Sequence, residues 1–468
     1  MQINYEIQLD QCFATWLTDP FNKPILDIIQ STAAALEEDK KVDFDFNVFD
    51  ISSKYLNSQK RKLPTLKSSS LGKTKFGTIS VCSSSPSLST VGEKIGTFYG
   101  LQEVSKERDF VCSMKHPISE EELEEFLKNY CKLPKCFASI FLEKYGPWDD
   151  FENFWRDCLN GRDPNERLFH LIVGGRKRNY VTPDDLMPYA RRIVQTHPSL
   201  EFLADEPMFQ GKFIDFIVTR CFYIMDDELR GIVNLQQFRK MDLAGVFFNA
   251  ENMDDVNDSH HIFNYQHFYV AFCKFWDIDT DSDSLISKND LLRFNDYSIS
   301  PIIAERFFNS TFYPMSSNKQ NNLINFTSFA YFLMCSEDKT NLTSINFWYK
   351  LCDLDDDGIL SIKEIEQLYD VQYERMRNTG NETIPFEDIF RQLMDMINPN
   401  CQSYITIPDL VESKMADVFF NTIFDLQKFL MREYQYPFIN YGMDELTKDL
   451  SPWEIYVLVE YDKLVNDN

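Results

Sequence analysis

Residues 353–364 read Asp-Leu-Asp-Asp-Asp-Gly-Ile-Leu-Ser-Ile-Lys-Glu. Carboxylates stand at the first, third, fifth and twelfth places, a spacing that brings hard oxygen ligands to one point, as calcium requires. Gly358 is sixth, where the chain must turn with a positive φ that glycine adopts freely. The seventh residue would offer its carbonyl, and the ninth its hydroxyl or a bridging water. The spacing predicts a calcium-binding loop with these ligands: Asp353, Asp355, Asp357, Ile359, Ser361 and Glu364.

This ligand pattern is that of an EF-hand, a helix–loop–helix unit; the alternative is an acidic surface turn that binds no ion. A second stretch, residues 279–290, repeats the pattern with Ser284 in place of the glycine. A non-glycine residue pays about 1 kcal/mol to adopt the left-handed conformation. The twelfth residue, Asp290, is one methylene shorter than Glu, so we expect weaker calcium binding here. The predicted ligands of this loop are Asp279, Asp281, Asp283, Leu285, Ser287 and Asp290.

Four further loops share the frame of an aliphatic residue at the eighth place but lack the ligands. They begin at Gly174, Asp226, Ser317 and Asn398, with Val181, Val233, Ile324 and Ile405 at the eighth place. The first of them carries arginines where acids belong, so it should repel calcium. We interpret the four as structural EF-hands that pair without metal. Three of the six loop starts lie roughly 37 residues apart, near the length of one repeated unit. The sequence therefore predicts a mainly α, elongated array of EF-hand-like units, two metal-competent and several degenerate.

Composition narrows the function classes. The formal net charge of −26 argues against nucleic acid or an anionic membrane as the main partner. The eleven cysteines include no C-x-x-C pair and are typical of reduced thiols in a cytosolic protein. The first thirty residues lack the pattern of a secretory signal, and no apolar run approaches the ~18 residues of a membrane span. We expect a cytoplasmic location, with the centrosome and the nucleus as further addresses.

The chain divides into six predicted segments. These are a variable N-terminal segment that can hold short helices (1–51), a disordered Ser/Lys-rich linker (52–96), an N-terminal helical domain with a degenerate EF-hand (97–205), a first EF-hand domain (206–335), a second EF-hand domain (336–440) and a C-terminal tail with a short helix (441–468). For the linker, the alternatives are a phosphorylatable or targeting segment and a strand that pairs with the acidic body.

Several strings, in order along the chain from about Ile95 to Val465, together resemble one family. They are Ile95-Gly96-Thr97-Phe98-Tyr99, Thr196-His197-Pro198 with Phe202-Leu203, Tyr265 to Trp276, Ser336-Glu337-Asp338-Lys339 with Thr343-Ser344-Ile345, Glu374-Arg375-Met376, Pro385-Phe386-Glu387-Asp388, Val418-Phe419-Phe420 with Phe424, and Trp453-Glu454 with Glu460-Tyr461. With the two acid-rich loops, they resemble the B double-prime regulatory subunits of protein phosphatase 2A.

The resemblance implies a non-catalytic subunit. Members of this family bind the HEAT-repeat scaffold subunit and contact the catalytic subunit, steering the phosphatase towards chosen phosphoserine and phosphothreonine substrates. The resemblance also implies one or two calcium ions, held by the two acid-rich loops, with the 279–290 loop near the scaffold contact. The candidate partner-facing side chains are Phe268, Phe272, Phe275 and Trp276, for which core packing of an EF-hand helix is the alternative.

Other function classes compete with this interpretation. A self-contained enzyme is not expected, because the six histidines form no metal-ligand pattern and no Ser or Cys is paired with a base in a recognisable frame. A stand-alone EF-hand calcium sensor and a cytoskeletal or centrosomal adaptor are the alternatives. Whether calcium is regulatory or permanently structural stays open at the level of the sequence.

Overall fold

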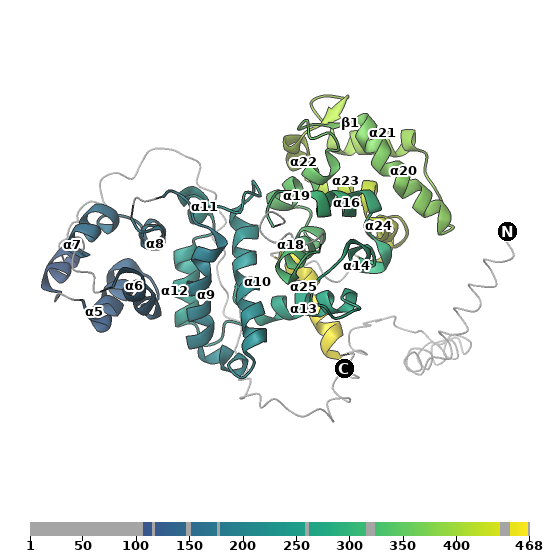
Figure 1. The fold of residues 1–468 in the computed structure, drawn as a ribbon. Helices are drawn as coiled ribbons and strands as arrows, with labels where there is room; N and C mark the ends of the chain where they lie inside the picture. Colours follow the sequence, from purple (N-terminus) through teal and green to yellow (C-terminus); the bar gives the residue numbers. More distant parts are fainter. Residues whose placement is uncertain are drawn as a thin grey trace, which may run out of the picture. The chain divides into compact units, whose positions relative to one another are not determined.

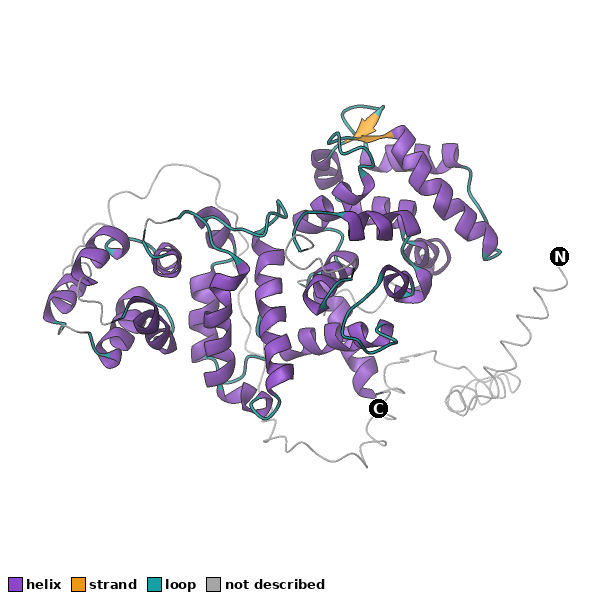
Figure 2. Cartoon of the chain, viewed as in Figure 1, coloured by secondary structure: helices purple, strands orange, loops and turns teal. Residues whose placement is uncertain are grey.

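The computed structural model of the protein describes residues 106–114, 118–146, 151–175, 178–257, 262–314, 323–439 and 450–466. The chain separates into two compact units, residues 1–90 and 91–468, and all described residues belong to the second. The predicted N-terminal segment and Ser/Lys-rich linker lie outside the described residues. Figure 2 shows that the described part is built from helices, with one short pair of strands.

The amino-terminal helices precede the first EF-hand loop. They are α5 (Glu120–Phe126), the π-helix Leu127–Cys131, the 3-10 helix Lys135–Phe137, α6 (Ala138–Tyr145), α7 (Phe151–Phe154) and the π-helix Trp155–Leu159. The next helices flank the loops that begin at residues 174 and 226. They are α8 (Pro164–Val173), α9 (Pro183–Thr196), the 3-10 helix Pro198–Leu203, α10 (Pro207–Met225), α11 (Leu235–Lys240) and α12 (Leu243–Asn252).

The remaining elements hold the two acid-rich loops (Figure 1). Around the 279–290 loop lie α13 (Tyr265–Ile278), α14 (Lys288–Leu292), α15 (Phe294–Tyr297), α16 (Pro301–Asn309) and α18 (Phe326–Glu337). Around the 353–364 loop lie α19 (Leu342–Cys352), β1 (Leu360–Ser361), α20 (Ile362–Asn378), α21 (Phe386–Ile397), β2 (Tyr404–Ile405), α22 (Ile407–Ser413), α23 (Ala416–Phe424), α24 (Leu426–Ile439) and α25 (Pro452–Asn466). None of the described helices is both long and apolar enough to cross a membrane.

The aliphatic residues at the eighth place of each loop meet in pairs. Val181 and Val233 exchange two backbone hydrogen bonds of 2.9 Å. Ile286 and Ile324 do the same at 2.8 and 3.0 Å. In the third pair the contact extends into the antiparallel strands β1 and β2, where Leu360 lies opposite Ile405. The predicted frame of EF-hand-like units is confirmed, and each acid-rich loop has a ligand-poor loop as its partner.

The ninth and twelfth residues of the loops begin the exit helices. A capping box, in which the ninth side chain caps the helix and the twelfth side chain bonds back to the ninth backbone N–H, occurs in five of the loops. The five pairs are Thr182 with Asp185, Asn234 with Gln237, Ser287 with Asp290, Ser361 with Glu364, and Thr406 with Asp409. The twelfth residue therefore caps a helix whether or not its loop can hold an ion.

Aromatic side chains fill the core between the helices. Phe268 of α13 packs against Phe213 of α10 with ring centroids 5.3 Å apart, and Phe275 packs edge-on against Phe326 of α18 at 5.6 Å. Burying a side chain of this size contributes about 2 kcal/mol of transfer free energy. The entering helix of the 279–290 loop is thereby fixed to the centre of the unit, which gives the loop a rigid base.

Two of the predicted domain boundaries fall within paired or continuous elements. The Val181–Val233 bridge joins residues on either side of the boundary at 205/206, and α18 runs across the boundary at 335/336. The grouping of the helices into separate domains stays a prediction.

A buried network of charges ties α24 to the turn that follows α18. Lys339 Nζ donates to Asp425 Oδ2 at 2.8 Å, and Lys428 Nζ donates to Glu337 Oε2 at 2.8 Å. Ser298 donates its hydroxyl to the other oxygen of Asp425. Burial acts to raise the pKa of Asp425, but the two lysine charges outweigh it and hold this pKa at about 2. Burial also lowers the pKa of Lys339, to about 8.

Replacing Asp425→Asn should destabilise the protein by about 3–5 kcal/mol, because the buried ammonium of Lys339 then loses its counter-charge. Chemical denaturation of the full chain measures this loss. The matched control is Asp388→Asn, whose partner Arg391 is exposed, and it should cost less than about 1 kcal/mol. Equal losses in the two variants would contradict a special role for the buried pair.

The same pair predicts a pH dependence. The pKa of Asp425 is depressed on folding, so its contribution is fully present above its ordinary pKa of about 3.9 and is lost as the pH falls towards about 2. The difference in unfolding free energy between wild type and Asp425→Asn should therefore be largest near pH 5 and shrink between about pH 4 and 2. It should also shrink as the pH rises towards about 8, where Lys339 loses its proton. A difference that stays constant to about pH 2 would exclude this assignment.

Candidate metal centres

The 353–364 loop brings three of its predicted ligands together. Carboxylate oxygens of Asp353, Asp355 and Glu364 lie within 4.8 Å of one another. Asp353 and Glu364 are each only 6% exposed, whereas Asp355 reaches solvent. Three carboxylates this close repel one another unless a cation or a proton separates them. The geometry therefore suits a small divalent ion with oxygen ligands.

Backbone N–H groups hold these carboxylates in place. Gly358, with φ of +87°, donates its N–H to Asp353 Oδ2 at 2.9 Å. Glu364 Oε1 accepts the N–H of Leu354 at 2.6 Å, and its Oε2 accepts the N–H and hydroxyl of Ser361 at 2.9 and 2.8 Å. The sixth place needs glycine for its conformation and not for space, because a Cβ there would meet no neighbour within 4 Å.

The electrostatics of the two buried carboxylates differ. Burial raises the pKa of Asp353, and the charges of Glu364 and Asp357 raise it further. Burial also acts to raise the pKa of Glu364, but the hydrogen bonds from Ser361, Leu354 and the next residue outweigh it and leave this pKa below its usual value. Asp353 is therefore the carboxylate that would gain most from a cation in the loop.

Two other predicted ligands lie at the side of this group. Asp357 accepts the N–H of Ile359 at 2.9 Å and does not belong to the cluster of three carboxylates. Ser361 caps α20, and its hydroxyl bonds to Glu364. The loop thus holds its first, third and twelfth ligands together, while its fifth supports the backbone.

The 279–290 loop brings together a different set. Carboxylate oxygens of Asp279, Asp281 and Asp283 lie within 4.8 Å of one another. Asp279 is 3% exposed, and its Oδ1 has no hydrogen-bond partner among the described residues. Burial raises the pKa of Asp279, and the neighbouring Asp281 and Asp283 add to the effect. A buried carboxylate oxygen without a donor fits a metal ligand, and the donor set is all oxygen, as calcium prefers.

Ser284 adopts the left-handed conformation that the sixth place requires. Its φ is +65°, and its N–H donates to Asp279 Oδ2 at 3.0 Å, as the glycine does in the other loop. Leu285 donates its N–H to Asp283 at 2.8 Å. The twelfth residue, Asp290, lies outside the carboxylate group and instead bonds to Ser287 and to the guanidinium of Arg293.

The four aromatic candidates on α13 have different surroundings. Phe268 and Phe275 are buried in the core, at 0% and 2% exposure, so core packing and not partner contact is their role in this structure. The stripe of aromatic residues faces inward because α10 and α18 pack on it. Phe272 is half-buried, and Trp276 is 40% exposed, which leaves these two for a partner. Their role in partner binding stays a prediction.

In the ligand-poor loops, side chains of the loop itself bond to the twelfth residue. Arg178, at the fifth place of its loop, pairs with Asp185 at the twelfth. Arg230, at the fifth place of the next, bonds to Glu228 at 2.9 Å and to Gln237 at the twelfth place at 3.4 Å. From the sequence, the arginines of the first of these loops are expected only to repel calcium. The sequence did contain a signal for these bonds: an arginine at the fifth place of a loop whose twelfth residue can accept a hydrogen bond.

A third ligand-poor loop uses an amide. The side chain of Asn400 donates to Asp409, at the twelfth place, at 2.9 Å. The Lys319 position of the loop that begins at Ser317 lies outside the described residues.

An arginine from the neighbouring hand also holds the 353–364 loop. Arg306 of α16 donates to the carbonyl oxygen of Asp353, to the carbonyl of Lys350 at 3.1 Å and to the carboxylate of Asp356 at 2.8 Å. Tyr349 donates its hydroxyl to the carbonyls of Gly358 at 3.1 Å and Ile405 at 2.9 Å. The loop is therefore linked both to its paired loop and to the hand before it.

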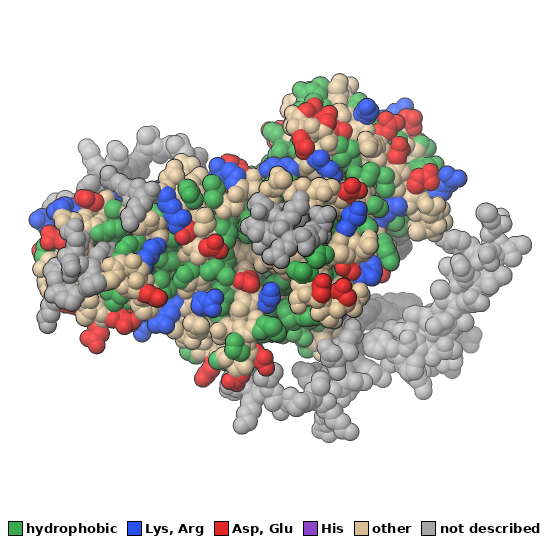
Figure 3. All heavy atoms as spheres, in the orientation of Figure 1, with side chains coloured by type: hydrophobic (Ala, Val, Ile, Leu, Met, Phe, Trp, Pro, Cys, Tyr) green, Lys and Arg blue, Asp and Glu red, His purple; other side chains and the backbone are tan. Residues whose placement is uncertain are grey.

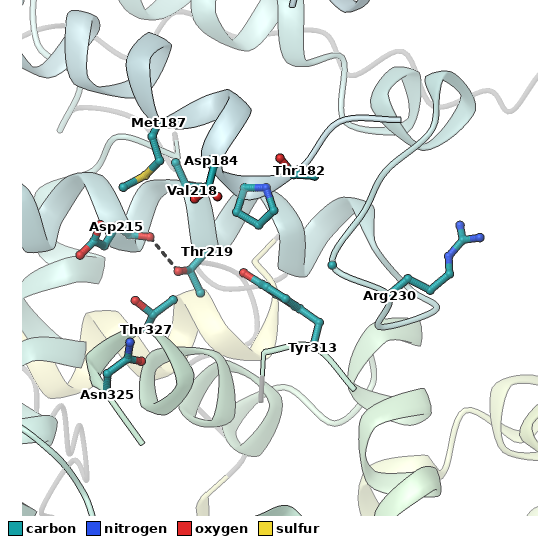
Figure 4. Close-up of a pocket in the computed structure, with 12 residues that line it drawn as sticks. Thr182, Asp184, Met187, Asp215, Val218, Thr219, Arg230, Tyr313, Asn325 and Thr327 are labelled. Carbon is teal, nitrogen blue, oxygen red and sulfur yellow. Dashed lines mark hydrogen bonds between the residues drawn. The ribbon is translucent and has the colours of Figure 1, made fainter. Parts of the chain in front are cut away.

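A cavity of about 430 Å³ lies beside the first pair of loops and is shown in Figure 4. In the figure, Tyr313 reaches into the space, Asp215 and Thr219 lie on one side, and Arg230 lies at the far end. Thr219 Oγ1 donates to the backbone carbonyl of Asp215 at 2.7 Å. The residues drawn include no His or Cys, and their one sulfur atom is the thioether of Met187.

Comparison with known proteins gives a consistent set of relatives. A family model described as an EF-hand domain matches residues 163–252, which contain the first pair of loops. The human B'' beta regulatory subunit of serine/threonine-protein phosphatase 2A is 35% identical over 318 residues, covering 67% of this chain and 55% of that protein. The human B'' alpha regulatory subunit of the same phosphatase is 34% identical over 316 residues, covering 67% of this chain and 28% of that protein.

A plant protein and a solved structure extend the comparison. The probable B''delta regulatory subunit of protein phosphatase 2A from Arabidopsis thaliana is 30% identical over 354 residues, covering 73% of this chain and 66% of that protein. A chain from a solved PP2A PR70 holoenzyme, designated diCa, is 35% identical, with a TM-score of 0.53 over 58% of this chain and 99% of the solved chain. The chain thus spans between 28% and 66% of the length of these curated relatives.

Glu364→Gln should weaken calcium binding at the 353–364 loop at least about ten-fold, because it removes one of the three converging carboxylate charges. Isothermal titration calorimetry of the full chain measures the change. The control is Asp356→Asn, which removes the same charge from a residue that bonds to Arg306 and lies outside the carboxylate cluster. Weakening of equal size in the control would indicate that net loop charge, and not the cluster, sets the affinity.

Proposed function

Because the chain belongs to the B double-prime family of regulatory subunits of protein phosphatase 2A, we propose that it is a calcium-binding, non-catalytic regulatory subunit. It binds the scaffold and catalytic subunits of the phosphatase and directs the enzyme to phosphoprotein substrates. The observation that carries this proposal is the pair of acid-rich loops in a helical frame that matches almost the whole length of the solved holoenzyme chain. The relatives are named as regulatory subunits, in agreement with a role that is not catalytic.

We propose that the chain holds two calcium ions, one in each acid-rich loop. Two separate groups of three carboxylates among the described residues support this number. The designation diCa of the solved relative agrees with it. The ligands of the two ions are the residues predicted from the loop spacing, with Asp353, Asp355 and Glu364 already close together in one loop and Asp279, Asp281 and Asp283 in the other.

The chain's own residues supply the link between calcium and a partner surface. Calcium removes the repulsion between the loop carboxylates and fixes the angle between the entering and exit helices. The 279–290 loop follows α13 directly, so a change in this loop acts on the exposed Trp276 near the end of that helix. If α13 faces the scaffold, calcium and the scaffold strengthen each other's binding by the same factor.

Charge on the molecular surface is compatible with a protein partner. Figure 3 shows acidic and basic side chains interspersed over the described residues of one face, and no single sign dominates it. Mixed charges of this kind favour specific pairing with a partner surface over general attraction to a polyanion. The cytoplasm, with the centrosome and the nucleus as further addresses, is part of the proposal.

The test is reconstitution of the full chain with purified scaffold and catalytic subunits of phosphatase 2A, with calcium and with chelator. We expect a stoichiometric complex whose affinity rises with calcium, because ordered loops fix the partner-facing helices. Surface plasmon resonance on immobilised scaffold gives the affinity in each buffer. Asp279→Asn combined with Asp281→Asn, which removes two of the three converging acids of the loop beside α13, serves as the calcium-insensitive variant. Asp356→Asn, which lies outside both carboxylate groups, serves as its control.

Each outcome has a distinct meaning. Binding that is equal in both buffers keeps the regulatory role and makes the calcium purely structural. If neither the scaffold nor the catalytic protein binds in either buffer while calcium still binds the isolated chain, the stand-alone calcium sensor replaces the proposal. Capture of cytoskeletal or centrosomal proteins without phosphatase subunits would favour the adaptor alternative.

A further inference from the structure

The twelfth residue of each loop differs in what it contacts. In the 353–364 loop the carboxylate of Glu364 lies within the group of converging acids. In the 279–290 loop the corresponding carboxylate, Asp290, is excluded from the group. This difference decides which three carboxylates converge in each loop before any ion arrives.

Arg293 binds the excluded carboxylate. It lies three residues after Asp290, and its guanidinium bonds to Asp290 Oδ1. The same guanidinium nitrogen donates to Thr280 Oγ1 at 2.9 Å and lies 3.4 Å from the carbonyl oxygen of Ile278. Thr280 and Ile278 flank Asp279, the first ligand, so Arg293 joins the start of the loop to its twelfth residue. This is the connection that a calcium ion makes in an EF-hand.

In two other loops of the chain an arginine also contacts the twelfth residue. Arg178 pairs with the twelfth residue Asp185, and Arg230 lies 3.4 Å from the twelfth residue Gln237. In both loops an arginine stands at the fifth place, where calcium needs an oxygen ligand, and its guanidinium contacts the twelfth residue. In the 353–364 loop, by contrast, Arg306 bonds to backbone carbonyls and to Asp356, and Glu364 keeps its place in the carboxylate group.

The 279–290 loop has both an arginine on its twelfth residue and acids at its first, third and fifth places. It keeps the three acids Asp279, Asp281 and Asp283, and the buried Oδ1 of Asp279 has no hydrogen-bond donor among the described residues. The guanidinium therefore satisfies the twelfth residue but leaves the first ligand in need of a cation. For a calcium ion to bind all its ligands in this loop, the ion pair between Asp290 and Arg293 must break.

We propose that Arg293 is an internal competitor for calcium: its guanidinium occupies Asp290, so the 279–290 loop binds calcium more weakly than its acids alone allow and fills after the 353–364 loop. This inference rests on the proposed calcium binding. It gives the two loops different thresholds, with the loop next to α13 responding at the higher calcium concentration. Asp290 continues to cap α14 through Ser287, so the exchange of partners leaves the exit helix in place.

The test is calorimetric titration of calcium into the full chain carrying both Asp353→Asn and Glu364→Gln, which removes two of the three converging acids of the 353–364 loop and so isolates the 279–290 loop. In this background, Arg293→Gln should tighten binding about five-fold, the effect of removing a competing ion pair worth about 1 kcal/mol. The matched control is Lys288→Gln, which removes a positive charge from the same loop. Lys288 faces Glu305 at 3.8 Å and makes no contact with Asp290 among the ion pairs of the described residues.

A double-mutant cycle separates competition from general charge. In the presence of Asp290→Asn, Arg293→Gln should leave the calcium affinity unchanged, because the contested carboxylate charge is gone while the amide oxygen can still cap the helix.

Tightening of equal size with Lys288→Gln, or tightening that persists in the Asp290→Asn background, would overturn the proposal. Unchanged, weaker or undetectable binding in Arg293→Gln would also overturn it, since the arginine would then support the loop. If the unmodified chain binds no calcium at either loop, it is the proposed function that fails.

Discussion

The backbone hydrogen bonds between eighth-place residues hold the loops in pairs, and the rest of the unit depends on them. Each bridge fixes two loops side by side, so the four flanking helices of a pair share one core. The entering helices α10, α13 and α19 then present their aromatic faces inward, where rings such as Phe268 and Phe275 pack. An acid-rich loop in such a pair is braced by a partner that needs no ion of its own.

Much of the frame could be predicted from the sequence because the loops obey fixed spacing. The aliphatic eighth residue identified all six loops, including the four without ligands. Which loops pair could not be predicted, since the intervening segments differ in length and the bridge itself carries no distinctive side chain. The two loops that looked alike in sequence also differ in structure: Glu364 reaches the carboxylate group, whereas Asp290 does not. The shorter side chain of Asp290 is visible in the sequence, but its ion pair with Arg293 is not, because the loop spacing does not place an arginine that lies outside the loop.

The aromatic stripe on α13 shows a second limit. Helical spacing placed Phe268, Phe272, Phe275 and Trp276 on related faces but did not say which of them turn inward. The packing of α10 and α18 buries the first and third and leaves Trp276 at the surface. The spacing of apolar residues predicts which of them share one side of a helix. How exposed each one is depends on which neighbouring helices pack over it.

The capping boxes at the ninth and twelfth places have a consequence for how such arrays change over time. Because each exit helix is started by its own loop residues, a hand that loses its acidic ligands still begins its helix and still pairs. Ligand loss is then nearly neutral for the fold, and an arginine acquired at the fifth place can take over the remaining charge. Repeated units of this kind can drift one at a time from ion binding to internal salt bridges. The chain combines loops with three converging acids and loops closed by internal side chains within a single molecule.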